Sequence, residues 1–326
     1  MNHTERNDAR TAAAIRAILA AVALAWLATG CATGAGSRQA RLDTVEIDWL
    51  SVKPVADGVR IMNLEFTEPR LMKAFIARVD LRTPGLSLTG TLRDPKWGEP
   101  MPDVTNRTIA IQTRRQRTAD FLAQARRPVE EGGRGLDMVL AFNTVPWSPW
   151  EEPFTHKYAK IPSPMVSDGV VVSEKGFGRG AALVAWKGGT LSVVDEVPEE
   201  VANDVWLAHR GFNIILRDGI DVAGEKATSL APRTACGLSD NGRWLYVLVV
   251  DGRQPEWSMG ANMHDLAAIL LRAGAANALN MDGGGSSTLV YWDAAAGEPV
   301  VCNQHSESGY TRPVAGNIGV YFEHDD

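Results

Sequence analysis

One continuous stretch combines a helix, a strand and a glycine-rich loop: residues 262–288 read NMHDLAAILLRAGAANALNMDGGGSST. Asn262 can cap a helix whose apolar residues recur at helical spacing, and Gly274 is suited to end that helix. The apolar run 276–281 follows directly and predicts a buried strand. Asp282 and three glycines come next. This stretch is the most informative part of the chain, because it places a carboxylate and unshielded backbone amides at a strand end.

The rest of the chain reads as further strands and one more helix. Short apolar and β-branched runs separated by Pro and Gly predict strands, and two pairs of runs predict hairpins. No linker rich in Pro or Ser divides residues 43–326, so we expect one domain there. The expected elements are a helix at 118–127, strands at 45–50, 59–66, 75–81, 86–92 and 136–142, and hairpins pairing 181–186 with 190–194 and 234–238 with 244–250.

Composition excludes several classes of protein. The chain has 326 residues, of which 45% are hydrophobic and 22% are charged, so a disordered chain and a collagen-like repeat are excluded. The net charge of −6 gives no general attraction to nucleic acid, and we expect no nucleic-acid partner. A local basic patch at Arg114, Arg115, Arg117, Arg126 and Arg127 is typical of a solvated helix face.

The first thirty residues predict export rather than fold. Three arginines precede the apolar run 17–28, which is the pattern of a signal peptide and is short for a bilayer span. The run leads into Cys31 in a way that resembles the site where bacterial lipoproteins are cleaved and acylated. Residues 1–30 would then be removed and 31–42 would form a tether to the outer membrane, rather than the inner one, on its periplasmic face. Ordinary secretion is the alternative.

The cysteine count bears on the same question. If Cys31 is acylated, the mature chain keeps Cys236 and Cys302. These two residues would enter a compartment in which disulfides persist, so a bridge between them is possible. Two buried thiols are equally compatible with the sequence.

Charged residues recur at the ends of apolar strands. Asp251 and Asp282 both end such runs, so both carboxylates can project into one cleft, where burial and neighbouring charges tune their protonation. The amides of the glycine loop and the hydroxyls of Ser286 and Ser287 can hold a phosphate or an oxyanion. No lysine follows the glycines as a nucleotide-binding P-loop requires.

Five motifs follow one another along the chain: RTACG at 233–237, VVDGR at 249–253, Ser258-x-Gly260, the Asp265-Leu266-Ala267 helix, and NMDGGGSST at 280–288. Together they resemble the phosphodiester glycosidase family. The similarity is densest between residues 232 and 291, and with weaker blocks it covers 107–322. The sequence departs from the family at 144–147, where TVPW stands in place of Gly-Phe-Phe, and at Asp265, where the family has Glu.

The resemblance implies an α+β or α/β fold, with a single mixed sheet and flanking helices. It also implies cleavage of a sugar-1-phosphodiester at the anomeric carbon, with N-acetylglucosamine among the candidate sugars. An acidic phosphate stabilises its own charge on leaving, so cationic donors matter more than a general acid. Asp282 and Asp251 become the catalytic candidates, with their roles unassigned. The implied phosphate ligands are Arg233, Arg253, Arg312, Gly283, Gly284, Ser286 and Ser287, and the implied sugar ligands are Asn143, Ser258 and Gly260.

Other interpretations stay open. Arg233 and Arg253 could form ion pairs with the two aspartates as a scaffold. The histidines show no zinc-binding spacing, and no cofactor is required, although a calcium or magnesium ion held by aspartates is compatible with the sequence. A metal-dependent phosphodiesterase that cuts the P–O bond is therefore one alternative. A non-catalytic envelope protein that binds polysaccharide is another.

Overall fold

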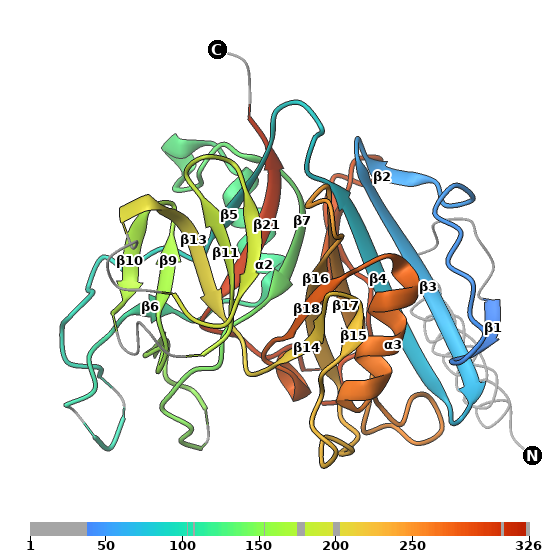
Figure 1. Cartoon of the computed structure of the whole chain (residues 1–326). Coiled ribbons are helices and arrows are strands. Elements are labelled where there is room, and N and C mark those ends of the chain that lie inside the picture. Colours follow the sequence, from blue (N-terminus) through green and yellow to red (C-terminus); the bar gives the residue numbers. More distant parts are fainter. Residues whose placement is uncertain are drawn as a thin grey trace, which may run out of the picture. The chain divides into compact units, whose positions relative to one another are not determined.

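Antiparallel strand pairing dominates the protein in the computed structural model (Figure 1). The structure describes residues 38–102, 104–106, 108–152, 154–174, 180–197, 203–307 and 310–323. The expected signal peptide, Cys31 and most of the expected tether lie outside these residues. Within them, no helix is both long and apolar enough to cross a membrane.

The largest sheet has nine strands in the order β1-β3-β4-β17-β16-β18-β14-β15, with β2 paired to β3. All of its pairings are antiparallel except that of β1 with β3. Its strands are β1 (Arg38–Arg41), β2 (Pro54–Ala56), β3 (Val59–Glu68), β4 (Met72–Asp80), β14 (Ile214–Arg217), β15 (Ile220–Asp221), β16 (Arg233–Leu238), β17 (Trp244–Val250) and β18 (Asn277–Asn280).

Helix α3 (Met263–Ala273) packs on this sheet, as Figure 1 shows. Asn262 caps it and forms a capping box with Asp265, and Gly274 ends it in the left-handed conformation. The buried face of the helix joins the sheet in one apolar core. The expected helix and its signals are confirmed.

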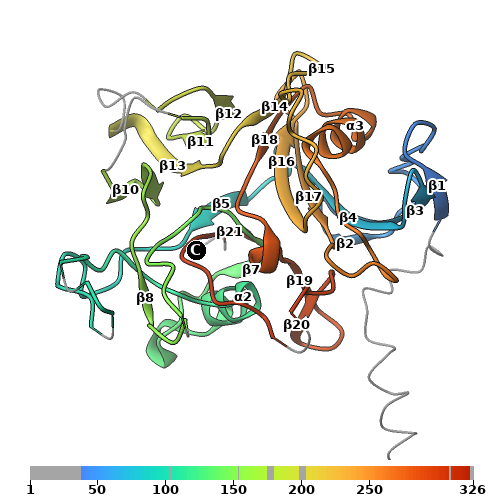
Figure 2. The ribbon, with the colours of Figure 1, turned by 90° about the horizontal axis from the view of Figure 1, so that it is seen from below.

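Two further sheets have five strands each, in the orders β20-β19-β7-β21-β5 and β10-β9-β13-β11-β12, and β6 pairs with β8. Helix α2 (Thr118–Arg126) packs against β7, β19 and β20 (Figure 2). The remaining elements are β5 (Leu86–Gly90), β6 (Thr113–Arg114), β7 (Asp137–Asn143), β8 (Tyr158–Ala159), β9 (Met165–Ser167), β10 (Val170–Ser173), β11 (Ala182–Trp186), β12 (Leu191–Val194), β13 (Val205–Arg210), β19 (Leu289–Asp293), β20 (Glu298–Val301), β21 (Asn317–Phe322) and the 3-10 turns η1 (Val129–Glu131) and η3 (Gly284–Ser286).

Three expectations about the fold are corrected. The described residues form several mainly antiparallel sheets rather than a single mixed sheet, and with only two α-helices among them the α/β alternative is wrong. Residues 45–50 are not a strand. Their apolar side chains are used as anchors instead, since Val45 and Trp49 are buried in the core and the Trp49 indole donates to the Ala273 carbonyl (3.1 Å).

The possible disulfide is not formed. Cys236 is a buried free thiol in β16, and burial raises its pKa to about 12. Cys302 follows β20, which belongs to a different sheet. The two cysteines therefore occupy separate layers of the fold, and neither braces the other's element.

Candidate active site

Asp282 and the glycine loop lie directly after β18. The Asp282 amide donates to the Thr144 carbonyl (2.7 Å), and the Gly284 amide donates to the Pro232 carbonyl (2.8 Å), so both ends of the loop are fixed to neighbouring segments. Gly284 has a φ of 64°, in the left-handed region that favours glycine. A Cβ atom on Gly285 would lie 2.6 Å from Nη2 of Arg312 and 2.5 Å from Oε1 of Glu307, so a larger residue there would displace this ion pair.

A cavity of about 300 Å³ opens beside this loop, and we call it the Asp282 cavity. It is lined by Asp282, Gly283, Gly284, Arg233, Arg253, Arg312, Trp150, Phe212, Ala231 and Met281. Six residues that the sequence assigned to chemistry are therefore brought together around one small space.

The Asp282 carboxyl is half-buried, and its protonation is shifted strongly. Burial raises its pKa to about 7, against the opposing effects of the Ser286 hydroxyl, the Arg312 charge and the Gly283 amide. Both the ionised and the protonated carboxyl are therefore accessible near neutral pH. Such a group can accept a proton from water and release it again under physiological conditions.

Three guanidinium groups face the same cavity from different elements. Arg233 begins β16 and is held by the carbonyls of Ala261 (3.2 Å) and Ser229 (2.8 Å), while burial and the charge of Arg253 lower its pKa. Arg253 follows β17 with a φ of 59°, which is uncommon for a residue with a side chain. Among the described residues neither of these two forms an ion pair, so the scaffold interpretation does not describe them.

Arg312 is held differently. It forms an ion pair with Glu307 and stacks over the Trp150 ring at 5.0 Å from the ring centre. The Trp150 side chain is 60% exposed at the rim of the cavity, and that of Phe212 is 47% exposed. Exposed aromatic faces next to a polar cavity suit the apolar faces of sugar rings.

Asn143 is fully buried at the end of β7. Its Nδ2 donates to the Asp282 carbonyl (2.7 Å), and its Oδ1 accepts from the Thr234 hydroxyl (2.8 Å) and the Thr288 amide (2.9 Å). The expected contact with a sugar is replaced by a structural one. Asn143 positions the Asp282 backbone relative to β16 and to the start of β19.

Asp251 lies outside the Asp282 cavity. Its carboxylate accepts from the Trp257 indole (2.8 Å) and from the Gln304 amide (3.0 Å), and burial raises its pKa to about 6. Asp251 follows β17 and Asp282 follows β18, and β16 lies between these two strands. The strands are therefore two spacings apart, roughly 10 Å in total. Asp251 joins the loop after β17 to the segment after β20.

The other expected sugar ligands also have structural roles. The buried Ser258 hydroxyl donates to the Asp251 carbonyl (2.7 Å) and accepts from the Lys73 amide (3.1 Å). Gly260 has a φ of 105°, and a Cβ atom there would lie 2.7 Å from the Ala231 carbonyl oxygen. Ser286 and Ser287, expected as phosphate ligands, are buried and do not line the Asp282 cavity.

The sequence assigned no role to three residues of the cavity, Phe212, Ala231 and Met281. The aromatic loop that holds Trp150 was expected either to face a sugar or to pack onto the core. Phe212 lies between β13 and β14, and no motif or spacing around it indicates an exposed position. Trp150 lies in an aromatic loop that suits a sugar-facing rim, whereas its neighbour Trp147 is buried and packs on it at 5.0 Å between ring centres.

The histidines and acidic residues do not form a metal centre in the described part of the chain, where no group of three or more metal-binding side chains gathers. His209 is fully buried, burial lowers its pKa to about 3, and its ring contacts the hydroxyls of Thr144 (2.7 Å) and Ser167 (3.2 Å). His264, on α3, pairs with Asp221 of β15 at 2.7 Å.

Comparison with known proteins locates the similarity in sequence and in fold. The model of the phosphodiester glycosidase family matches residues 151–321. No curated protein sequence matches the chain. The fold is similar to the catalytic domain of zebrafish N-acetylglucosamine-1-phosphodiester alpha-N-acetylglucosaminidase, auto-inhibited by its pro-peptide, with a TM-score of 0.56 and 21% identity over 82% of this chain and 83% of that one.

Two bacterial structures share the fold as well. One is a hypothetical protein from Synechocystis, with a TM-score of 0.53 and 13% identity over 82% of this chain and 63% of that one. The other is a putative exported protein from Burkholderia pseudomallei, with a TM-score of 0.51 and 14% identity over 77% of this chain and 74% of that one.

Proposed function

Because the chain belongs to the phosphodiester glycosidase family, we propose that it hydrolyses the bond between the anomeric carbon of a sugar and the oxygen of a phosphodiester. The observation that carries this proposal is the half-buried Asp282 carboxyl among three guanidinium groups in one cavity. N-acetylglucosamine is the first sugar to test, since the zebrafish enzyme of similar fold is named for that substrate.

In this proposal the arginines bind the phosphate. Arg233 and Arg253 present planar donors that no carboxylate neutralises within the described residues, and such donors match phosphate oxygens in pairs. The amides of the glycine loop lie beside them. The leaving phosphate carries its negative charge on oxygens that these groups already contact, so the reaction needs little protonation of the leaving oxygen.

Asp282 acts at the anomeric carbon as a general base. Its ionised carboxylate takes one proton from a water molecule as the water oxygen bonds to the anomeric carbon. The bond from that carbon to the phosphate oxygen breaks, and its electron pair stays on the phosphate. Trp150 holds the sugar by stacking on its apolar face. The products are the free sugar and a phosphomonoester.

Hydrolysis in water enriched in oxygen-18 tests the proposed bond cleavage. The substrate is a methyl phosphodiester of N-acetylglucosamine-1-phosphate, followed by other sugar-1-phosphodiesters. We expect the label in the released sugar, with inversion at the anomeric carbon. Label in the phosphate would instead support a metal-dependent phosphodiesterase, and tight glycan binding without turnover of any substrate would support a binding protein.

We also propose where the protein acts, from the pattern of its amino terminus. The positive head, the apolar run 17–28 and the small residues before Cys31 support export and acylation. We therefore place the protein at the periplasmic face of a bacterial outer membrane, held by lipid, where its substrate is an envelope or extracellular glycan. A lipid anchor at the amino terminus would leave the catalytic domain in the aqueous phase.

A further inference from the structure

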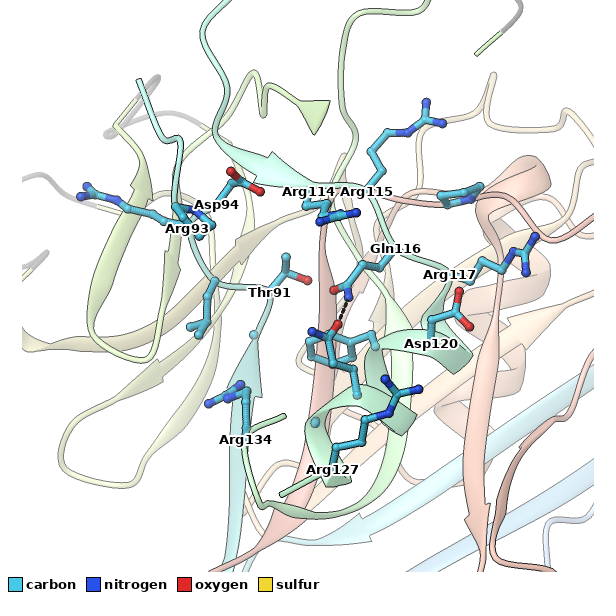
Figure 3. A pocket seen from close by; sticks show the side chains of 17 residues that line it. Thr91, Arg93, Asp94, Arg114, Arg115, Gln116, Arg117, Asp120, Arg127 and Arg134 are labelled. Atoms are coloured by element: carbon cyan, nitrogen blue, oxygen red, sulfur yellow. Dashed lines mark hydrogen bonds between the residues drawn. The ribbon is translucent and has the colours of Figure 1, made fainter. Parts of the chain in front are cut away.

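A second and larger cavity, of about 740 Å³, lies between the segment after β5, the segment around β6 and helix α2. We call it the arginine cavity (Figure 3). Its lining includes the arginines at positions 93, 114, 115, 117, 127 and 134, with only Asp94 and Asp120 as acidic residues. The chain as a whole has a net charge of −6, so positive charge is concentrated here against the overall balance.

Three of these arginines are exposed and unengaged. Within the part of the chain that the structure describes, no hydrogen bond or ion pair involves the guanidinium groups of Arg114, Arg117 and Arg127. Arg117 and Arg127 flank the two ends of α2, and Figure 3 shows both beside this helix. In this lining six arginines face two aspartates, and such an excess of positive charge attracts an anionic ligand.

The other cationic side chains form a fixed wall. Arg134 pairs with Asp168 at 2.6 Å, and Arg93 donates to the Val171 carbonyl. Arg115 is buried and donates to the Phe154 carbonyl (2.7 Å). A rigid wall with three unengaged arginines at its rim can bind a ligand that carries several separated negative charges.

The arginine cavity adjoins the Asp282 cavity through one short segment. Arg312 lines the first-described cavity, and the next residue, Pro313, lines the arginine cavity. Gln116 and Val314 exchange two backbone hydrogen bonds, of 3.0 and 2.8 Å. This pairing ties the wall of the arginine cavity to the segment that presents Arg312.

Stacked side chains connect the same two cavities. Arg115 lies over the Trp147 ring at 4.5 Å, and Trp147 packs on Trp150 at 5.0 Å between ring centres. Trp150 lines the Asp282 cavity. The rim of the Asp282 cavity and the wall of the arginine cavity are therefore in contact through Trp147.

We infer that the arginine cavity binds phosphate groups of an extended glycosyl-phosphate polymer, whose reacting linkage lies in the Asp282 cavity. This inference rests on the proposed function and names its substrate class: a polymer with repeated phosphodiesters rather than a single small sugar phosphate. Among the polar side chains of the lining, Gln116 donates to Gln124 and the Thr91 hydroxyl accepts from the Asn317 amide (2.9 Å), so the arginines are the main donors left for a ligand.

The lining favours a glycan over a nucleic acid. Single-stranded nucleic acids bind on exposed aromatic rings on which their bases stack. Phe121 is the aromatic side chain in this lining, and it is buried in the core with 6% exposure. The cavity therefore offers charge and hydrogen bonds without a stacking surface.

Direct binding tests the cavity without any turnover. The probes are an oligomer of about ten hexose-1-phosphate units, a neutral oligomer of the same sugar and length, and single-stranded DNA of equal charge, titrated by calorimetry into the Asp282→Asn variant of the full chain. We expect the Kd of the phosphate oligomer to be about tenfold lower than the Kd of either other probe. Equal binding of the DNA, or of the neutral oligomer, would overturn the inference.

Variants locate the binding. Arg117→Ala with Arg127→Ala should weaken oligomer binding about tenfold and flatten its salt dependence, since two charge contacts are lost. The conservative pair Arg117→Lys with Arg127→Lys should retain most of the affinity. The control pair Lys53→Ala with Arg82→Ala removes two exposed positive charges elsewhere and should change nothing. Equal losses in the control pair, or no loss in the arginine pair, would contradict the inference.

Kinetics separates this inference from the proposed function. In the catalytically intact chain, the alanine pair at 117 and 127 should raise KM for the polymer about tenfold and leave kcat/KM for a methyl sugar-1-phosphodiester unchanged. If the small substrate is not hydrolysed at all, the proposed function fails while the binding result still stands. If the pair lowers activity on both substrates equally, the arginine cavity is not a separate subsite.

Discussion

Asp282 combines a functional use with an energetic cost. Its carboxyl is removed from water at the end of β18, and the surrounding serine, amide and arginine offset only part of that loss, so its pKa stays near 7 rather than at 3.8. A carboxylate with this pKa is a competent base at neutral pH. The same burial destabilises the folded state whenever the group is ionised, which is a common property of active sites.

Replacing each aspartate tests their separate roles. Asp282→Asn keeps the shape of the side chain but removes the base, so kcat should fall by about 10² to 10⁴. The variant should also be more stable at pH 8, with a free energy of unfolding that is higher by about 1–2 kcal/mol, as measured by urea denaturation. This figure allows for the partial exposure of the group. Asp251→Asn is the matched control, because it should retain most of the activity and lose about 1–2 kcal/mol of stability through its weakened hydrogen bonds. Loss of activity in both variants to the same degree would contradict the division of roles.

The pH dependence follows from the same group. The folded pKa of about 7 lies above the ordinary value of 3.8, and the base is active when ionised, so kcat should rise with pH and level off above the folded pKa. The contribution of Asp282 to stability should fall as pH rises from its ordinary pKa of 3.8 to the folded pKa of about 7, because the native state binds the proton more tightly than the unfolded chain does. Arg312 lowers the pKa of Asp282, so Arg312→Gln should move the kinetic inflection to higher pH. An inflection that stays in place would show that another group titrates.

At the scale of elements, the sequence predicted those helices and hairpins that depend on interactions between residues close together in the chain. Helix α3 follows from Asn262, its apolar spacing and Gly274, and the hairpin of β16 and β17 follows from its turn residues. The grouping of strands into sheets depends on long-range pairs such as Phe75 with Val249, for which the sequence has no local signal. Residues 45–50 have strand-like composition but are held by Trp49 as a buried anchor.

The same difference between local signals and long-range packing applies to the candidate site. Strand ends predicted one cleft for Asp251 and Asp282, and the family resemblance added Arg233 and Arg253 as phosphate ligands. The structure brings the two arginines and Asp282 to one cavity and leaves Asp251 outside it. The direction of a side chain after its strand depends on tertiary packing, so Asp251 and Asn143 could not be told from ligands by position alone. Both are engaged in internal hydrogen bonds.

The cap of α3 gives a prediction at this scale. Asn262 accepts from the Asp265 amide at 2.9 Å, and Asp265 also pairs with Arg70, so the start of the helix is tied to the segment before β4. Asn262→Ala should lower the free energy of unfolding by about 1 kcal/mol, measured by urea denaturation. Leu271→Ala, at a position of the same helix that is 45% exposed, is the control and should have a smaller effect. An equal loss in both would show that the cap contributes nothing of its own.

At the scale of the whole molecule, charge is distributed unevenly. A chain with a net charge of −6 gathers unneutralised arginines in two adjoining cavities, which suits the capture of an anionic polymer. The proposed lipid anchor would hold these cavities close to the envelope surface. Tethering raises the local concentration of enzyme at a polymeric substrate without any new contact in the active site.

Acylation at Cys31 is the prediction that belongs to this scale. The full chain, expressed in a Gram-negative host fed with labelled palmitate, should carry the label and sediment with the membrane fraction. Cys31→Ser should lose essentially all label and appear in the soluble periplasmic fraction. Hydrolysis of a small sugar-1-phosphodiester should be unchanged, because Cys31 precedes the first described strand, β1, which begins at Arg38. Cys236→Ser is the control: its thiol is buried in β16, so this variant should keep the label. Label retained after Cys31→Ser would place the lipid elsewhere, and an unlabelled wild-type chain in the periplasm would show ordinary secretion.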